Sequence, residues 1–127
     1  EVTAAILKKK SNLKKIVKIV HLEIRKKMNR FVQKHKNKKI VILDIPLLLE
    51  NKINKKNDIL IFVDAKKINI MKRLKKRKNF DLKLLNIFKQ TQLPLNYKKR
   101  SSQFVIKNNF TNNPVKKDIN LILNKIL

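Results

Sequence analysis

The sequence contains no glycine among its 127 residues. The two common nucleotide-phosphate loops, GxxxxGK[ST] and GxGxxG, need glycine so that the backbone can approach the phosphates closely. These residues therefore cannot form either loop. If the protein handles a nucleotide, we expect its phosphate-cradling loop to lie outside them.

Cysteine is also absent, which excludes a disulfide framework, a thiolate metal site and a cysteine nucleophile. No run reaches the roughly 20 apolar residues of a membrane span, and no signal-peptide pattern opens the sequence. These absences are compatible with the cytoplasm, and we predict a cytoplasmic protein without a membrane partner. The chain begins with Glu1 and not with methionine, so we expect a fragment or a processed product.

Acidic residues are scarce: 8 Asp and Glu stand against 34 Lys and Arg, and the formal net charge is +26. Such a charge attracts polyanions and suggests a nucleic-acid partner. However, the excess is mostly lysine, and the lysines are spread over every segment alongside many Asn and Ile. This distribution is more typical of a biased overall composition than of a dedicated DNA-binding surface. We therefore expect phosphate-bearing ligands and no specific nucleic-acid partner.

The stretch Ile40–Glu50, read as IVILDIPLLLE, is the most informative part of the chain. Its first four residues, Ile40–Leu43, are apolar on both faces, which is typical of a buried strand in a parallel sheet covered by helices. Pro46 cannot donate to a sheet ladder, so we expect the strand to stop at Asp44. A carboxylate at the carboxyl end of such a strand lies where open α/β sheets bind their ligands. Asp44 is therefore a candidate site residue.

The remaining segments predict alternating helices and strands. A helix is expected over 4–37, with an apolar stripe from Leu13 to Phe31 and with Ser11 or Asn12 as the cap of an internal break. Strands are further expected at 58–64 and 103–107, helices at 65–78, 82–91, 94–100 and 115–127, and at least one helical turn within 47–57. The last helix should turn Ile119, Leu121, Ile122 and Ile126 inward. With right-handed crossovers, this order gives an α/β fold with a parallel sheet flanked by helices.

Three side chains stand out from this pattern. His21 falls on the apolar side of the first helix, either as a core-edge histidine or as a polar group that reaches a ligand cleft. Arg73 and Arg77 are four residues apart, so both should project from one helix face. A solvated basic face is the ordinary role of such charges, but an arginine fork can also bind phosphate through two parallel hydrogen bonds.

Five sequence motifs follow one another along the chain. They are Leu13-Lys14-Lys15-Ile16 leading to Ile19-Val20-His21, Asp44-Ile45-Pro46-Leu47-Leu48-Leu49-Glu50, Val63-Asp64 followed by Arg73-Leu74 and Arg77, Gln92-Leu93-Pro94-Leu95 with Lys98, and Val105-Ile106-Lys107-Asn108. Together they resemble the dephospho-coenzyme A kinases, which have the P-loop nucleotide-kinase fold. The second motif is close to the family's D-x-P-L-L-x-E, its most specific signature in this region. The resemblance implies that residues 1–127 are the carboxyl-terminal part of a single kinase domain, with a helical lid at about 66–101 and the P-loop N-terminal to them.

The chain also departs from the family pattern in three places. Leu22 replaces the proline that follows the family's histidine. Ser102 and Gln103 stand where the family usually has Ala-Asp, which leaves the role of that carboxylate open. The glycine that often follows the V-I-x-N asparagine is missing, and Asn109 is expected to supply the left-handed conformation in its place.

The resemblance implies an enzyme that transfers the γ-phosphate of ATP to the ribose 3′-hydroxyl of dephospho-coenzyme A with Mg²⁺, the last step of coenzyme A biosynthesis. ATP and dephospho-coenzyme A are then its partners. Arg73 and Arg77 would clamp ATP phosphates from the lid, and Asn108 would border the adenine. Asp44 would be the catalytic carboxylate, near the Mg²⁺ and its waters without ligating the metal directly. The acceptor side would be shaped by His21, Pro46, Leu47, Leu48 and Glu50.

Two other classes remain open. A non-catalytic basic α/β module that binds nucleic acid or acidic partners would show clustered stacking aromatics and a basic stripe, whereas the aromatics here lie mostly on apolar helix faces or in strands. A degenerate kinase-like remnant without activity is the other class, supported by the missing glycines and altered motifs. We expect residues 1–127 alone to be inactive.

Overall fold

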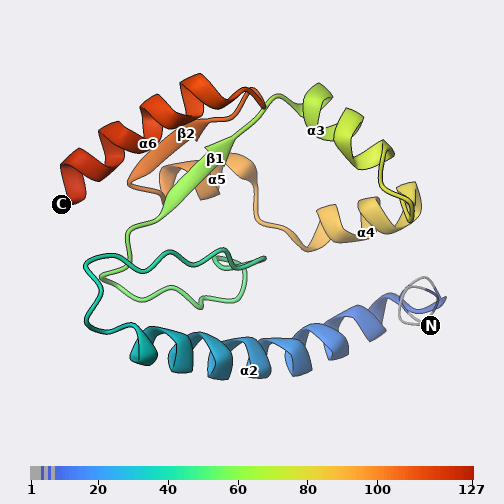
Figure 1. The fold of residues 1–127 in the computed structure, drawn as a ribbon. Helices are drawn as coiled ribbons and strands as arrows, with labels where there is room; N and C mark the ends of the chain where they lie inside the picture. The colour runs from blue at the N-terminus through green and yellow to red at the C-terminus, as the bar shows by residue number, and fades with distance from the viewer. Residues whose placement is uncertain (1–3, 5, 7) are drawn as a thin grey trace. The chain divides into compact units, whose positions relative to one another are not determined.

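The computed structural model describes residues 4, 6 and 8–127. The chain is α/β, and its elements are α2 (Lys10–Lys34), β1 (Ile61–Asp64), α3 (Lys67–Lys75), α4 (Leu82–Thr91), α5 (Leu95–Arg100), β2 (Phe104–Lys107) and α6 (Asn112–Ile126) (Figure 1). They divide into two compact units. The first unit comprises Glu1–Asn54 and Asp81–Gln92, and the second comprises Lys55–Phe80 and Leu93–Leu127.

The sheet lies in the second unit and consists of β1 and β2. The two strands are parallel, with Ile61 opposite Phe104 and Asp64 opposite Lys107. A parallel pair cannot be joined by a tight hairpin and needs a long crossover, which here runs through α3, α4 and α5. The predicted α/β class with a parallel sheet and flanking helices is therefore confirmed.

Both strands are shorter than predicted at their amino ends: β1 begins at Ile61 and β2 begins at Phe104. Oδ2 of Asp58 accepts a hydrogen bond from the backbone N–H of Lys55 at 2.8 Å, which closes a turn that ends at the first residue of the predicted strand. Oε1 of Gln103 accepts from the N–H of Leu60 at 2.7 Å. Gln103, one of the departures from the family pattern, thus satisfies the backbone just before β1.

Helix α6 covers the sheet and forms the core of the second unit with β2. Ile106 of β2 is 9% exposed and Ile122 of α6 is 7% exposed. Oδ2 of Asp118 accepts from the backbone N–H of Lys107 at 3.0 Å, so the helix is also tied to the end of β2. With Ile122 facing β2, Ile119 and Leu121 are exposed. Their predicted inward orientation is wrong.

Helix α6 starts at Asn112, three residues before the predicted start at Val115. Pro114 therefore lies inside the helix and not before it. A proline in the first turn costs no helical hydrogen bond, because the first N–H groups of a helix have no partner inside it.

The first unit is built around the long helix α2. Residues 5 and 7 of the predicted helix lie outside the described residues. The predicted break exists, but the non-helical residue is Lys9, with φ −150°, and Ser11 and Asn12 lie inside α2. Leu13 of α2 and Ile53 of the following connection are 5% and 6% exposed, and they belong to the core.

The carboxyl end of α2 comes at Lys34, three residues before the predicted end. Nδ1 of His35 donates to the carbonyl oxygen of Phe31 at 2.8 Å. The two rings also lie against each other, with centroids 4.3 Å apart. His35 therefore satisfies one of the last carbonyl groups of the helix, which have no partner inside it.

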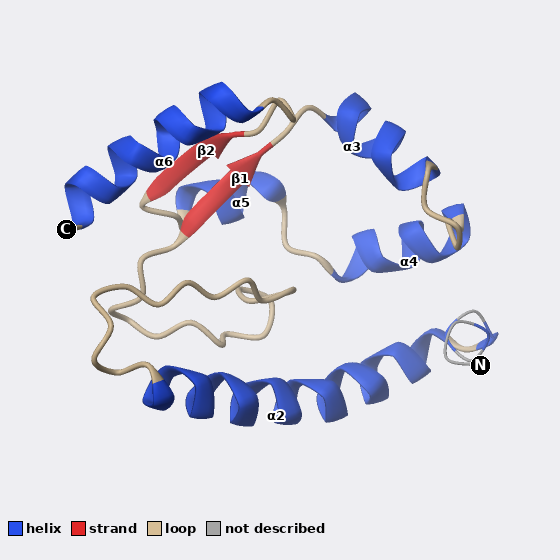
Figure 2. Ribbon diagram, in the orientation of Figure 1, coloured by secondary structure: helices blue, strands red, loops and turns tan. Residues whose placement is uncertain are grey.

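The predicted buried strand Ile40–Leu43 is wrong. The connection between α2 and β1 contains no strand (Figure 2). Ile42 is 81% exposed and Leu43 is 40% exposed. A strand apolar on both faces requires neighbouring strands and covering helices, and among the described residues only β1 and β2 pair.

The segment after Pro46 folds into a turn. The backbone N–H of Asn51 donates to the carbonyl oxygen of Leu47 at 3.1 Å, which is the spacing of one helical turn. Nδ2 of Asn51 donates to the same oxygen at 2.8 Å. The helical turn predicted within 47–57 is therefore confirmed, although Leu47 itself has a left-handed φ of 56°.

The short helices between the strands were better predicted than the long connection. Helix α4 has the predicted bounds, and Oδ1 of Asp81 caps it by accepting from the N–H of Leu84 at 2.8 Å. Helix α5 follows Pro94 and ends at Arg100, as expected. None of the helices in the described part of the chain is long and apolar enough to cross a membrane.

Candidate functional site

The carboxyl ends of the two parallel strands meet in the second unit, and ligands commonly bind at this edge of an α/β sheet. The backbone N–H of Asn108, just after β2, donates to the carbonyl oxygen of Asp64, at the end of β1, at 2.7 Å. Oδ2 of Asp64 lies 2.9 Å from Nζ of Lys99 on α5. Residues from β1, β2 and α5 are thereby fixed around one edge of the sheet.

The loop from Asn108 to Thr111 is held by its own asparagine side chains. Oδ1 of Asn108 accepts from the N–H of Phe110 at 2.8 Å, and Oδ1 of Asn109 accepts from the N–H of Thr111 at 3.1 Å. The left-handed residue of the loop is Phe110, with φ 65°. The expectation that Asn109 takes this conformation is wrong, because its side chain instead anchors Thr111.

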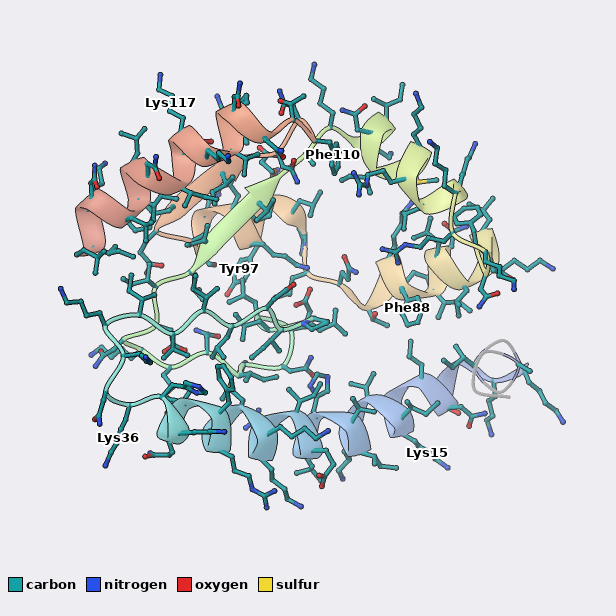
Figure 3. The ribbon with its side chains drawn as sticks, in the orientation of Figure 1. Lys15, Lys36, Phe88, Tyr97, Phe110 and Lys117 are labelled. Atoms are coloured by element: carbon teal, nitrogen blue, oxygen red, sulfur yellow. The ribbon has the colours of Figure 1, made fainter. Side chains whose placement is uncertain are left out.

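Arg73 of α3 reaches this loop. Its guanidinium carbon lies 4.6 Å from the centroid of the Phe110 ring. Two of the three residues predicted for the ATP side, Arg73 and Asn108, therefore contact the same aromatic residue, which Figure 3 labels in the loop before α6.

The sequence interpretation did not single out Phe110 or Lys99. Phe110 could have been noticed as the one aromatic in a polar run of Asn and Thr. Lys99 follows Lys98, the lysine that the family motif marks, and nothing in the local pattern distinguishes the two. Only the tertiary structure reveals that Lys99 pairs with Asp64.

Arg77 does not lie on the same helix face as Arg73, and that expectation is wrong. Helix α3 ends at Lys75, and Arg77 lies in the turn that follows. Its N–H donates to the carbonyl oxygen of Leu74 at 3.0 Å, and its carbonyl accepts from the N–H of Phe80 at 3.0 Å. A longer helix would align Arg73 with Arg77 and Lys72 with Lys76, and like charges four residues apart destabilise a helix.

In the first unit, His21 lines a pocket of about 430 Å³. The lining residues are Val17, Lys18, His21, Leu22, Arg25 and Asn51. Nδ1 of His21 is buried and has no hydrogen-bond partner among the described residues. Lys18, His21 and Arg25 follow one another at helical spacing on α2. Lys18 and Arg25 supply positive charge to one side of the pocket, and its remaining helix residues, Val17 and Leu22, are apolar.

The segment 46–51 contacts this pocket through Asn51. Nη2 of Arg25 donates to the carbonyl oxygen of Asn51 at 2.8 Å. Because Asn51 is also bonded to Leu47, the predicted acceptor-side segment and His21 belong to one connected site. Leu47, Leu48 and Glu50 are half-buried, whereas Pro46 is exposed.

Asp44 precedes this segment in the first unit. It is exposed, and among the described residues it makes no ion pair. Its predicted place at the end of a buried strand is wrong, because residues 40–43 form no strand. Within the described part of the chain, no three His, Asp or Glu side chains gather as a ligand set for a metal ion.

Exposed lysines occur in both units. Lys15 and Lys36 in the first unit and Lys117 in the second all point away from the ribbon (Figure 3), and all three are exposed. Two exposed ion pairs join Lys26 with Glu23 and Lys99 with Asp64, both at 2.9 Å. Surface pairs of this kind contribute little to stability.

Comparison with known proteins agrees with the motifs. The sequence profile described as Dephospho-CoA kinase matches residues 2–113. The dephospho-CoA kinase of Wolbachia pipientis wMel is 34% identical over 97 residues, which are 75% of this chain and 49% of the relative. That of Bacillus thuringiensis subsp. konkukian is 36% identical over 110 residues, 85% of this chain and 55% of the relative.

A third relative, the dephospho-CoA kinase of Lactobacillus acidophilus, is 32% identical over 119 residues, which are 90% of this chain and 58% of the relative. The chain therefore spans about half the length of the curated relatives it matches. The matched residues include the segments that build both the Arg73–Phe110 contact and the His21 pocket. The chain belongs to the dephospho-CoA kinase family.

Proposed function

We propose that the protein transfers the γ-phosphate of ATP to the ribose 3′-hydroxyl of dephospho-coenzyme A. A bond forms between the 3′-oxygen and the γ-phosphorus, and the bond from that phosphorus to the β,γ-bridging oxygen breaks. ADP and coenzyme A are the products, and the hydroxyl proton is released. Residues 1–127 supply the lid and acceptor side of this reaction, since they hold no glycine for a phosphate loop.

The observation that carries the proposal is the contact of Arg73 and Asn108 with the same residue at the carboxyl edge of the sheet. The resemblance to the family implies an ATP-side role for both residues, which are far apart in the chain. Phosphoryl transfer requires positioned cations around the phosphates more than covalent chemistry. A guanidinium held at this edge, with Arg77 following in the next turn, is suited to that role.

The His21 pocket is the proposed acceptor side. Dephospho-coenzyme A carries a diphosphate and a long, largely uncharged arm. Lys18 and Arg25 match the anionic part of this molecule, and Val17 and Leu22 match the arm. The unsatisfied Nδ1 of His21 is a polar atom for which a bound ligand would provide the missing partner.

Asp44 is the proposed carboxylate of the reaction centre. Mg²⁺ commonly keeps several waters and binds through one or two carboxylates together with substrate phosphates. A single exposed carboxylate without an ion pair among the described residues can accept hydrogen bonds from the waters of such an ion. When bound, Mg²⁺ neutralises charge on the β- and γ-phosphates. Asp44 would orient its waters.

The experiment is to incubate the complete gene product with ATP, Mg²⁺ and dephospho-coenzyme A and to separate the products chromatographically. The proposal predicts coenzyme A and ADP in equal amounts. Coenzyme A itself is the matched control acceptor, because its 3′-hydroxyl already carries phosphate, and it should yield no ADP. ADP release that does not depend on dephospho-coenzyme A would refute the assignment.

One observation favours a second candidate, a nucleic-acid-binding module. Tyr97 is 55% exposed, and it directly precedes Lys98, Lys99 and Arg100 on α5. An exposed ring beside cations can stack on a base, and loss of such a ring weakens single-strand binding by roughly 1–3 kcal/mol. Titration of single-stranded RNA and DNA into wild type and Tyr97→Leu separates the candidates. The kinase proposal predicts salt-sensitive binding that is indifferent to this substitution.

A further inference from the structure

Phe110 occupies a backbone conformation that suits it poorly. Its φ of 65° lies in the left-handed region, where a bulky side chain is disfavoured and asparagine is tolerated. Asn108 and Asn109 stand immediately before it, yet neither takes the left-handed position. The backbone conformation alone therefore gives no reason for an aromatic residue here, and the role of Phe110 must be sought in what its ring contacts.

The ring contacts Arg73, whose guanidinium carbon lies 4.6 Å from the ring centroid. This distance is within the range of a cation–π interaction. Among the described residues, the guanidinium of Arg73 makes no hydrogen bond or ion pair. A guanidinium that lies over a ring keeps its N–H groups available at the edge of its plane, where they can bind phosphate oxygens.

Asn108 anchors the loop that carries the ring, because it makes one hydrogen bond to Phe110 and another to the end of β1. Oδ1 of Asn108 accepts from the N–H of Phe110 at 2.8 Å. The N–H of Asn108 in turn donates to the carbonyl oxygen of Asp64 at 2.7 Å. The ring is thus connected to the ends of both strands, and it offers the long arginine side chain a fixed surface. A side chain that is ordered before the ligand arrives loses less conformational entropy on binding, so the entropic cost of binding is smaller.

We infer that Phe110 is a positioning residue for Arg73, which it holds beside the carboxyl edge of the sheet so that the guanidinium can receive the phosphates of ATP. This inference rests on the proposed function and deepens it. Phe110 itself donates nothing to the phosphates. Its effect on the reaction passes entirely through the arginine.

The test compares Phe110→Leu with Phe110→Tyr in the complete gene product. Leucine keeps an apolar side chain but removes the π face, and tyrosine keeps the face. We expect Phe110→Leu to raise KM for ATP roughly two- to fivefold, the range that corresponds to an exposed cation–π contact, with kcat unchanged. Phe110→Tyr should restore the wild-type KM. Leu121→Ala, which removes an exposed apolar side chain of the same unit, is the matched control and should leave KM unchanged.

A nuclear magnetic resonance measurement reads the contact without any activity. In wild type the δ protons of Arg73 should be shifted upfield by the ring current of Phe110. The shift should persist in Phe110→Tyr and disappear in Phe110→Leu. An absent upfield shift in the wild-type protein would overturn the inference, even if KM changed in the variant.

A double-mutant comparison separates positioning from a merely structural role. If Phe110 acts through Arg73, Phe110→Leu adds nothing to KM once Arg73→Met is present. An equal rise in KM in both backgrounds would overturn the inference and leave the proposed kinase intact. If Arg73→Met itself leaves KM unchanged, the lid role of Arg73 fails and the inference fails with it.

Discussion

The backbone N–H of Asn108 donates to the carbonyl oxygen of Asp64 at 2.7 Å and joins the ends of β1 and β2. Two sequence motifs, Val63-Asp64 and Val105-Ile106-Lys107-Asn108, thereby become neighbours at one edge of the sheet. Arg73 reaches the same edge through Phe110. This edge therefore brings together residues from segments that are distant in the chain.

The core of the second unit predicts a large difference between two adjacent residues of α6. Ile122 is 7% exposed and Leu121 is 53% exposed. Ile122→Ala should lower the free energy of unfolding by about 2–5 kcal/mol, because it leaves a cavity against β2. Leu121→Ala should change it by less than about 0.5 kcal/mol. Urea unfolding followed by circular dichroism measures both, and equal effects would contradict the packing of α6.

The cap of α4 predicts a smaller and more local effect. Asp81→Ala removes the acceptor of the Leu84 N–H and should cost about 1 kcal/mol of stability. Asp81→Asn keeps an oxygen in place and should cost little. Both variants can be compared in the same urea unfolding experiment. A loss of stability as large for Asn as for Ala would indicate that the charge of Asp81, and not its hydrogen bond, stabilises this region.

Asp44 should matter for the rate and not for stability. Because its carboxylate is exposed and makes no ion pair among the described residues, Asp44→Asn should change the free energy of unfolding by less than about 0.5 kcal/mol. Loss of a charge-assisted contact in the transition state should slow coenzyme A formation roughly tenfold or more in the complete gene product. Glu23→Gln removes one exposed negative charge from the same unit and serves as the control. An unchanged rate for Asp44→Asn at saturating Mg²⁺ would exclude it from the reaction centre.

Residues 1–127 by themselves should not turn over ATP. They contain no glycine, so they cannot form a GxxxxGK[ST] loop around the phosphates. The measurement is ADP release by the purified 127-residue chain, with dephospho-coenzyme A present and contaminating kinases excluded. Sustained turnover above the level of a mock purification would show that another backbone arrangement can replace the loop.

The sequence was most informative where local chemistry decides the structure. Asp81 before an apolar helical stripe and Pro94 before a short helix predicted α4 and α5 correctly, because capping and proline geometry act within one turn. The parallel sheet was also predicted. Its strands are apolar, and the order of helices and strands leaves few alternatives.

The failures have a common physical origin in contacts that lie far apart in sequence. Ile40–Leu43 has the composition of a buried strand, but a strand forms only with a partner, and none of the described residues pairs with it. The Arg73–Phe110 contact joins α3 to a loop beyond β2 and leaves no periodic signal. Helix α3 ends before Arg77. Like charges four residues apart disfavour a longer helix, and a pattern of apolar spacing contains no information about them.

The lid assignment, including its predicted extent of about 66–101, depends on a difference between arginine and lysine. Lys75 at the end of α3 and Arg77 in the turn that follows are both exposed. If Arg77 binds ATP phosphates, Arg77→Lys retains the charge but loses the planar fork that contacts two oxygens. If the region is only a solvated basic surface, the exchange is silent.

The most direct measurement is therefore the rate of coenzyme A formation by the complete gene product carrying Arg77→Lys or Lys75→Arg. Charge-assisted hydrogen bonds contribute about 1.5–3 kcal/mol each, so we predict that Arg77→Lys lowers the rate roughly ten- to a hundredfold. Lys75→Arg should leave the rate unchanged. Equal rates for wild type and Arg77→Lys would contradict the account.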